Sequence, residues 1–218
     1  MSPSFSLDDP LAVSDLQTYL GRAGRVEDGA VRLIATGGVL AAYTAVLYPH
    51  GLLDQTPTVL GLRTFRTGPA SEFDTVVPTR GLLDRLARAE PSEISLPLEV
   101  STATWAGISP PRGGWQSMGT TDAALLKRVA GDGIEEVARA IPEGTGEQLV
   151  WRVRGSVWGA PIAELGDVPA GVAFAADSLG FLGGDDEQIR VFETGPWSRI
   201  STRRGHVLVK HAASSLRG

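Results

Sequence analysis

The order in which helical and strand-like periodicities follow one another constrains the fold of this chain most. An apolar stripe at helical spacing begins after Asp8 or Asp9, either of which can cap the helix, and runs to about Gly24. Four segments of strand character follow, the first two flanking Gly37-Gly38 as in a hairpin: 32–36, 39–48, 58–67 and 73–77. A second helix starts from a cap at Thr79. The first hundred residues therefore predict a helix, an antiparallel meander and a helix.

The segment Val77-Pro78-Thr79-Arg80 joins the fourth predicted strand to the second helix. Strands that lead into a helix through a Val-Pro-x-Arg-like segment resemble the half-domain pattern of sliding-clamp proteins. The resemblance covers about 60 residues and rests on the order of the elements, so it is an analogy of fold. It implies a clamp-like fold for this part of the chain and, by itself, no function.

The rest of the chain predicts further helices and a final meander. A helix capped by Thr120 or Thr121 extends toward Ile141, and its two glycines, Gly131 and Gly133, require that it bend or pack closely on a neighbour. Residues 147–158 fit both periodicities, and we favour a helix, while 169–181 predict a buried helix. Three strands follow, over 188–194, 197–202 and 206–210. The predicted fold class is α+β, with antiparallel meanders packed with four or five helices and a C-terminal three-stranded meander.

The domain organisation follows from these segments. Residues 1–96 predict an N-terminal subdomain of helix and antiparallel sheet, and residues 120–218 predict a helical segment that ends in the basic meander. Residues 97–119 lack regular periodicity and predict an ordered loop rich in Pro, Gly and Trp. A chain of 218 residues can also form one compact domain from all of these parts.

Positive charge is concentrated at the end of the chain. Residues 190–218 hold six Lys and Arg but one acid, Glu193, although the whole chain has a net charge of −5. If Arg204-Gly205 forms a two-residue hairpin loop, strand alternation places one set of side chains on a common face: Trp197, Arg199, Ser201, Arg203, His206, Leu208 and Lys210. This cationic face could accept phosphate, carboxylate or a nucleic-acid backbone. The alternative is that these charges only solvate an outer strand and discourage edge pairing.

A second candidate site lies in the segment 105–115. Its Trp, Pro and Gly residues indicate a backbone held in fixed conformations and anchored by large side chains. Gly113-Gly114 would let a ligand approach, while Arg112 supplies a bidentate donor and Trp115 a stacking face, with Trp105 as the other aromatic. The alternative is a structural plug, in which the Trp side chains fill the core beneath the loop.

Asp177 is the one acidic residue on the predicted helix 169–181. Its spacing from Ala173, Phe174 and Phe181 predicts that it lies on an apolar face. A carboxylate there needs a cationic partner or a raised pKa, which makes Asp177 the candidate for an active-site acid or base. The alternatives are an internal ion pair with an arginine, or exposure at the edge of the helix.

The sequence lacks motifs for other kinds of catalytic chemistry. The nucleophile elbow, the phosphate-binding loops and the zinc-protease helix are absent, and the lack of Cys excludes thiolate chemistry. The acids at 185–187 could attract a cation but lack the alternating spacing of a calcium loop. We therefore expect no metal and no cofactor.

The sequence also bears on location and partners. Its start lacks the basic and apolar regions of a signal peptide, and no stretch approaches the roughly 18 apolar residues of a membrane span. The excess of 18 Arg over two Lys and the absence of Asn suggest a high-GC bacterial genome. We expect a soluble, cytoplasmic bacterial protein without a membrane partner.

Three functional hypotheses remain. The first is a binding protein that uses the 105–115 loop to hold a protein partner or a small anionic ligand. The second is an enzyme acting on a small anionic substrate, with Asp177 as acid or base and an arginine as clamp, and the third is a nucleic-acid-associated protein using the terminal hairpin. We favour binding over catalysis, and the sequence leaves a homo-oligomer open.

Overall fold

The computed structural model describes residues 4–7, 9–51, 53–68, 71–88, 93–97, 103–142 and 144–212. The chain forms two compact units, each made from two stretches of sequence. Unit 1 consists of Met1–Ala45 and Leu62–Ser109, and unit 2 of Val46–Gly61 and Pro110–Gly218. No helix among the described residues has the length and apolar character needed to cross a membrane.

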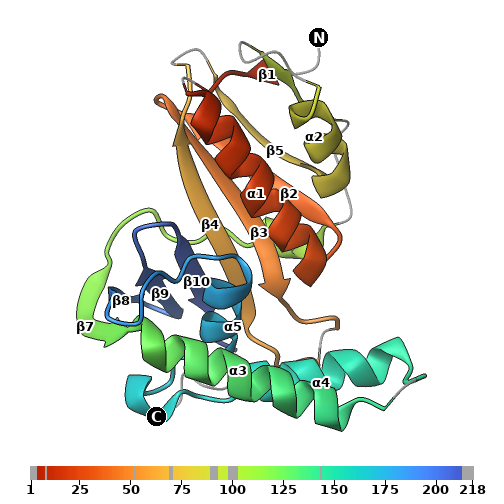
Figure 1. The fold of residues 1–218 in the computed structure, drawn as a ribbon, viewed down its shortest axis with the longest axis vertical. Coiled ribbons are helices and arrows are strands. Elements are labelled where there is room, and N and C mark those ends of the chain that lie inside the picture. Colours follow the sequence, from red (N-terminus) through yellow and green to blue (C-terminus); the bar gives the residue numbers. More distant parts are fainter. Residues whose placement is uncertain are drawn as a thin grey trace. The chain divides into compact units, whose positions relative to one another are not determined.

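Unit 1 pairs helices with antiparallel strands, as the order of its elements predicts (Figure 1). Strand β2 pairs with β3 on one side and with β5 on the other. The hairpin turn between β2 and β3 is Gly37-Gly38, with φ angles of 57° and 78°, the left-handed region that such a two-residue turn requires. The elements of this part of the chain are β1 (Ser4–Phe5), α1 (Pro10–Val26), β2 (Ala30–Thr36), β3 (Val39–Leu47), β4 (Thr58–Arg66), β5 (Phe73–Pro78), α2 (Thr79–Leu86), β6 (Ile94–Ser95) and η1 (Thr104–Gly107).

Helix α1 packs through its predicted apolar stripe. Asp9 caps it by accepting a hydrogen bond from the Leu11 amide at 2.8 Å, and Pro10 occupies the first turn, whereas Asp8 lies outside the described residues. The Tyr19 hydroxyl lies 2.8 Å from Thr44 Oγ1 and donates to the Ala42 carbonyl at 3.3 Å, which ties the helix to β3. The predicted cap of α2 is wrong, because Pro78 occupies the cap position and Thr79 is already the first helical residue.

Unit 2 contains three α-helices and the strands β7, β8, β9 and β10, which pair in this order as antiparallel neighbours (Figure 1). Its strands bury an alternating apolar set on one face, including Ile189, Val191, Ile200, Val207 and Val209. The elements are β7 (Gln116–Asp122), α3 (Ala123–Ala140), α4 (Glu147–Gly159), η2 (Ala163–Leu165), α5 (Gly171–Ser178), β8 (Gln188–Thr194), β9 (Trp197–Ser201) and β10 (His206–Lys210). The α+β class, the helix near 147–158 and the C-terminal three-stranded meander are therefore confirmed.

Helices α3 and α4 approach each other closely at one glycine. A Cβ atom placed on Gly133 would lie 2.3 Å from Cζ3 of Trp158, and Trp158 in turn stacks on Phe174 with ring centroids 4.3 Å apart. The same construction at Gly131 meets no atom within 4 Å. The sequence allowed a bend or close packing, and at Gly133 the structure has close packing.

The predicted start of α3 is wrong. Residues 116–122 form the strand β7 on the edge of β8, so the cap is Asp122, whose Oδ1 accepts from the Leu125 amide at 2.7 Å, and neither Thr120 nor Thr121 caps the helix. The irregular stretch expected over 97–119 thus ends before Gln116, and residues 98–102 of it lie outside the described part of the chain.

Candidate functional site

One face of the unit 2 sheet gathers aromatic and cationic side chains from three neighbouring strands. The register places Arg190, Ser201 and His206 in one row across β8, β9 and β10, and Phe192, Arg199 and Leu208 in the next. Directly opposed residues of an antiparallel pair share a face, and diagonal neighbours lie about 7–8 Å apart. A third row holds Thr194, Trp197 and Lys210. We call this set, together with Trp115, the cationic face.

Arg199 lies at the centre of the cationic face between two aromatic rings. Its Cζ atom is 4.5 Å from the ring centroid of Trp115 and 4.5 Å from that of Phe192. Trp115 is held in turn by a hydrogen bond from its indole Nε1 to the Pro111 carbonyl at 3.1 Å. Contact with two aromatic rings restricts the guanidinium, and because Nε is buried, the Nη groups are the donors that a ligand would approach.

The donors of Arg199 have no acceptor among the described residues. Its Nε is buried without a hydrogen-bond partner, and its guanidinium makes no ion pair. Burial, and then the charge of Arg190, lower the pKa of Arg199. Burial, followed by the charges of Arg199 and Arg190, likewise lowers the pKa of His206, whose Nδ1 lies 2.9 Å from Ser201 Oγ. No carboxylate contributes to either shift, and neither Arg199 nor Arg190 forms an ion pair with another residue that the structure describes.

Most of the residues predicted for the terminal meander meet on this face. Arg199, His206 and Lys210 lie on it as the alternation predicts, and Trp197 does so with only 5% of its surface exposed. Arg203 does not, because the hairpin loop spans residues 202–205 and not Arg204-Gly205 alone. The Thr202 hydroxyl accepts hydrogen bonds from the amides of residues 204 and 205, which closes this longer turn and leaves the Arg203 side chain exposed outside the strands.

Sequence reasoning missed Arg190 and Phe192, although the signal was available. Both have the same parity in β8 as Thr194, and extending the alternation by one strand would have placed them beside Arg199. The contact of Trp115 with Arg199 carried no local signal, since it joins the end of the 105–115 loop to a strand more than eighty residues later.

The other residues of the 105–115 loop are divided between the two units. Trp105 belongs to unit 1 and is 5% exposed, in a 3-10 turn held by Arg32, which donates to the Ala106 carbonyl at 2.7 Å and to Ser109 Oγ at 2.9 Å. Arg112 belongs to unit 2, is exposed, and pairs with no other described residue. Trp115 is therefore the residue of this loop that contacts the predicted site on the terminal meander, through Arg199.

Asp177 does not lie on an apolar face. It is exposed on α5 and has no partner among the described residues, so the expectation of a buried carboxylate is wrong. Helix α5 has only eight residues, and its one polar edge falls where Asp177 stands. Of the alternatives that the sequence left open for Asp177, the structure therefore has exposure at the edge of the helix.

A serine and a histidine do meet in unit 2, but not in a form that supports catalysis. Ser198 Oγ lies 2.7 Å from His211 Nε2, the spacing of a nucleophile and its base. Ser198 is only 1% exposed, so no substrate carbonyl can reach its hydroxyl. Burial lowers the pKa of His211, although Glu193 and Asp167 act in the opposite direction. The pair is a buried structural hydrogen bond.

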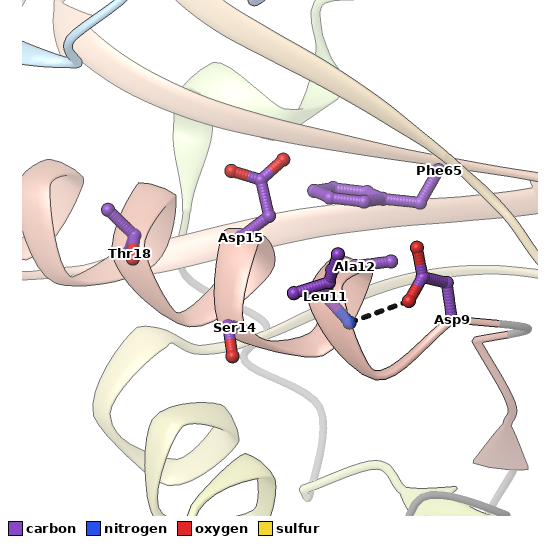
Figure 2. A pocket seen from close by; sticks show the side chains of 7 residues that line it. All are labelled: Asp9, Leu11, Ala12, Ser14, Asp15, Thr18 and Phe65. Carbon is purple, nitrogen blue, oxygen red and sulfur yellow. Dashed lines mark hydrogen bonds between the residues drawn. The ribbon is translucent and has the colours of Figure 1, made fainter.

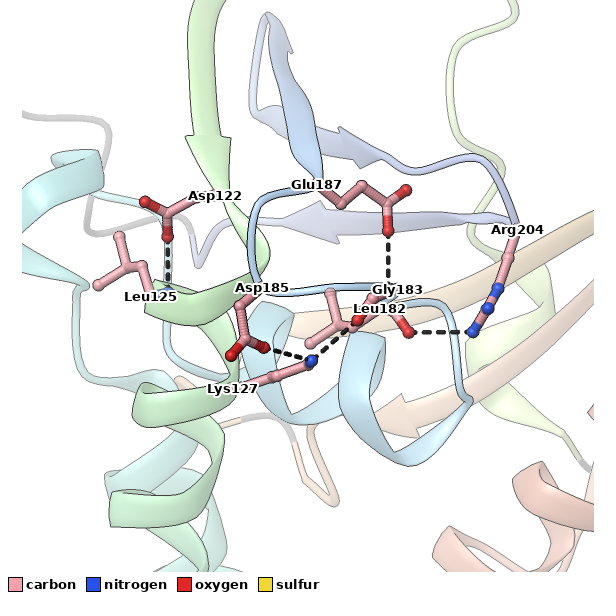
Figure 3. Close-up of polar contacts among 8 residues, drawn as sticks. All are labelled: Asp122, Leu125, Lys127, Leu182, Gly183, Asp185, Glu187 and Arg204. Carbon is pink, nitrogen blue, oxygen red and sulfur yellow. Dashed lines mark hydrogen bonds and ion pairs between the residues drawn. The ribbon is translucent and has the colours of Figure 1, made fainter.

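Two surface pockets are lined or bordered by polar side chains that already contact other residues of the protein. Near the acids 185–187 (Figure 3), Lys127 Nζ binds Asp185 at 2.7 Å and the Gly183 carbonyl at 2.8 Å, Glu187 accepts from the Gly183 amide at 2.7 Å, and Arg204 donates to the Leu182 carbonyl at 3.1 Å. The adjacent pocket measures about 370 Å³. No cluster of metal-binding side chains occurs in the described parts of the chain.

The second pocket, in unit 1, measures about 520 Å³ and follows the first turns of α1, with Phe65 of β4 on its wall (Figure 2). Asp9 in this groove caps the helix, and Asp15 pairs with Arg63. Both carboxylates already have structural roles, so the groove offers no free charged group.

Two family models match successive parts of the sequence, and they meet near the change from unit 1 to unit 2 at Ser109 and Pro110. Domain of unknown function (DUF8010) matches residues 1–107, and Domain of unknown function (DUF8185) matches residues 110–214. Among proteins with curated descriptions, no sequence matches this chain.

Solved structures of sliding clamps share the fold. The DNA polymerase sliding clamp from Caulobacter crescentus is similar with a TM-score of 0.53 and 13% identity, over 97% of this chain and 66% of that one. A DnaN sliding clamp (DNA polymerase III subunit beta) from Bartonella birtlesii, bound to griselimycin, is similar with a TM-score of 0.54 and 13% identity, over 96% of this chain and 65% of that one. The chain thus covers less than two thirds of the length of either clamp. At this identity the likeness concerns the fold alone, and at that level it extends the resemblance seen around Val77-Pro78-Thr79-Arg80 to nearly the whole chain.

Proposed function

We propose that this chain is a binding protein without chemistry of its own, and that its cationic face recognises an anionic group of a partner. The observation that carries this proposal is Arg199, held between Trp115 and Phe192 with a buried Nε that has no acceptor. Ordering an arginine side chain costs up to about 2 kcal/mol of rotamer entropy. Contact with the two rings restricts the Arg199 side chain before a ligand binds, so binding loses less of this entropy.

Other ordered arginines of this chain provide the comparison. In the described part of the chain, four pair with a carboxylate: Arg32 with Asp74, Arg63 with Asp15, Arg80 with Asp28, and Arg128 with Glu164. Arg199 contacts two aromatic rings instead and has no such partner among the same residues. An arginine whose position is fixed and whose donors are unpaired is the arrangement that bidentate recognition of an oxyanion needs.

Catalysis has less support, because Asp177 is solvated and Ser198 is inaccessible. The similar solved structures carry the name of DNA polymerase sliding clamps, so analogy of fold also favours a role in binding. Nucleic acid remains the competing partner. It is disfavoured by the net charge of −5.

The test compares wild type with Arg199→Gln and Arg203→Gln on columns of poly-L-glutamate and heparin at low salt. Both variants remove one positive charge from the same hairpin, but only the first removes it from the cationic face. We expect Arg199→Gln to elute at clearly lower salt than Arg203→Gln, which should elute close to wild type. Equal shifts for the two variants, or no retention of wild type on either polymer, would overturn the proposal.

A further inference from the structure

We infer that the anionic group received by the cationic face is a dianionic phosphate monoester, bound by Arg199 and Arg190 with His206 as a third donor. This inference rests on the proposed function and specifies the ligand class of that same site.

The first argument is the number of charges. Arg190 and Arg199 are diagonal neighbours on β8 and β9, each is close enough to shift the titration of His206, and Arg190 also lowers the pKa of Arg199. Two guanidinium groups that repel each other without a counterion are neutralised by two negative charges, which a phosphate monoester supplies near neutral pH. A carboxylate brings a single charge and would leave one guanidinium uncompensated.

The second argument is the number of donors. The edge of Arg199 is unpaired, Arg190 is exposed, and the Nδ1 of His206 is engaged by Ser201, which leaves His206 Nε2 directed away from that bond. Arg190 of β8, Arg199 of β9 and His206 of β10 lie in adjacent rows of the face, so all three can supply N–H donors to one ligand. A phosphate monoester has three terminal oxygens to accept from them, whereas a carboxylate has two.

The third argument separates a monoester from a nucleic acid. Non-specific binding of single strands uses open aromatic faces on which bases stack. Here the guanidinium of Arg199 covers one face of both Trp115 and Phe192, Arg190 lies 5.6 Å from the Phe192 centroid, and Trp197 is only 5% exposed. The aromatic surface therefore serves to hold the arginine and is not free for bases. A phosphodiester also carries one charge per phosphate and two bulky substituents.

Binding of a dianion should also be coupled to protonation of His206. The groups whose charges act on this imidazole are Arg199 from β9 and Arg190 from β8, and both disfavour its charged form. A bound dianion offsets that repulsion and raises the pKa of His206, so binding takes up a proton and strengthens as the pH falls. Sulfate is the probe for this effect, because it stays dianionic between about pH 5.5 and 8 while the imidazole titrates.

The experiment measures binding of phosphoserine, glutamate and dimethyl phosphate by isothermal titration calorimetry at constant ionic strength. We expect wild type to bind phosphoserine at least about tenfold more tightly than either monoanion. Arg190→Gln and Arg199→Gln should each weaken phosphoserine binding by about tenfold or more, and Arg203→Gln by less than about twofold. Arg190→Gln keeps the stacked Arg199 in place, so the result does not depend on how Arg199→Gln packs.

Two further arms complete the test. Sulfate affinity should rise between about pH 8 and 5.5 in wild type, and His206→Gln should flatten that rise. Tighter binding of a phosphoserine peptide than of inorganic phosphate assigns the group to a modified partner protein, and equal binding assigns it to small phosphate compounds.

Equal affinity for the dianion and the two monoanions, or preference for dimethyl phosphate, would overturn the inference. If retention on poly-L-glutamate still depended on Arg199, the proposed function would survive that result. If no anion binding depended on Arg199, both the inference and the proposed function would be refuted.

Discussion

Gly133→Ala tests the packing of unit 2 at its tightest point. The added methyl carbon would lie 2.3, 2.6 and 3.2 Å from three ring carbons of Trp158. Trp158 cannot yield easily, because it is 2% exposed and stacks on the ring of Phe174. Overpacking of this kind costs about 1–3 kcal/mol, and the gain in helix propensity from Gly to Ala returns roughly 1 kcal/mol. We expect a net loss of up to about 2 kcal/mol in the free energy of unfolding.

Gly131→Ala is the matched control, since it makes the same change two residues earlier in α3, where no atom lies within 4 Å. It should stabilise the protein by up to about 1 kcal/mol through propensity alone. Urea unfolding followed by circular dichroism and tryptophan fluorescence gives both values, and the two probes together reveal whether the units unfold separately. If Gly133→Ala proved as stable as Gly131→Ala, the close approach of α3 to Trp158 would be refuted.

Three other predictions concern charged groups. Arg32→Ala should destabilise by about 2–3 kcal/mol and shift the emission of Trp105 to the red, since it removes the ion pair with Asp74 and the hydrogen bond to the Ala106 carbonyl. An unchanged melting temperature would contradict this. The pKa of His206 is lower in the folded protein than in the unfolded chain. Its contribution to the free energy of unfolding is therefore complete above the unfolded pKa of about 6.5 and is lost as the pH falls through the folded pKa. His206→Gln should therefore reduce the fall in urea midpoint between about pH 7.5 and 5.5, and an unaltered fall would count against the shift. Asp177→Ala should change the free energy of unfolding by no more than about 0.5 kcal/mol in urea titrations, and a larger loss would mean that the carboxylate has a partner.

The sequence predicted those features of the fold that depend on local periodicity. Period-2 alternation placed Arg199, His206 and Lys210 on a common face, and the Gly37-Gly38 dipeptide located the first hairpin. The strand β7 was not predicted, because residues 116–122 are mostly small or polar. A bulge between Ser117 and Gly119 also interrupts the alternation of its side chains. Its existence depends on pairing with β8, which is a tertiary interaction.

The candidate site illustrates the same limit. Trp115 and Arg199 were each singled out from sequence, but for separate sites, and their contact follows only from the fold. Asp177 was misplaced because α5 is too short for its spacing to distinguish a buried from an exposed edge. Arg203 was misplaced because the Thr202 hydroxyl stabilises a longer turn than the Arg-Gly dipeptide suggested.

The central claim is that Arg199 and Arg190 form an anion site prepared by stacking. The most direct test follows the side-chain Nε–Hε signals of all 18 arginines by NMR in ¹⁵N-labelled protein during a titration with phosphoserine. We predict saturable shifts of the Arg199 and Arg190 signals, with a smaller response from exposed arginines such as Arg112 and Arg203. Small, linear shifts spread evenly over all the arginines, with no saturation at Arg199, would contradict the claim.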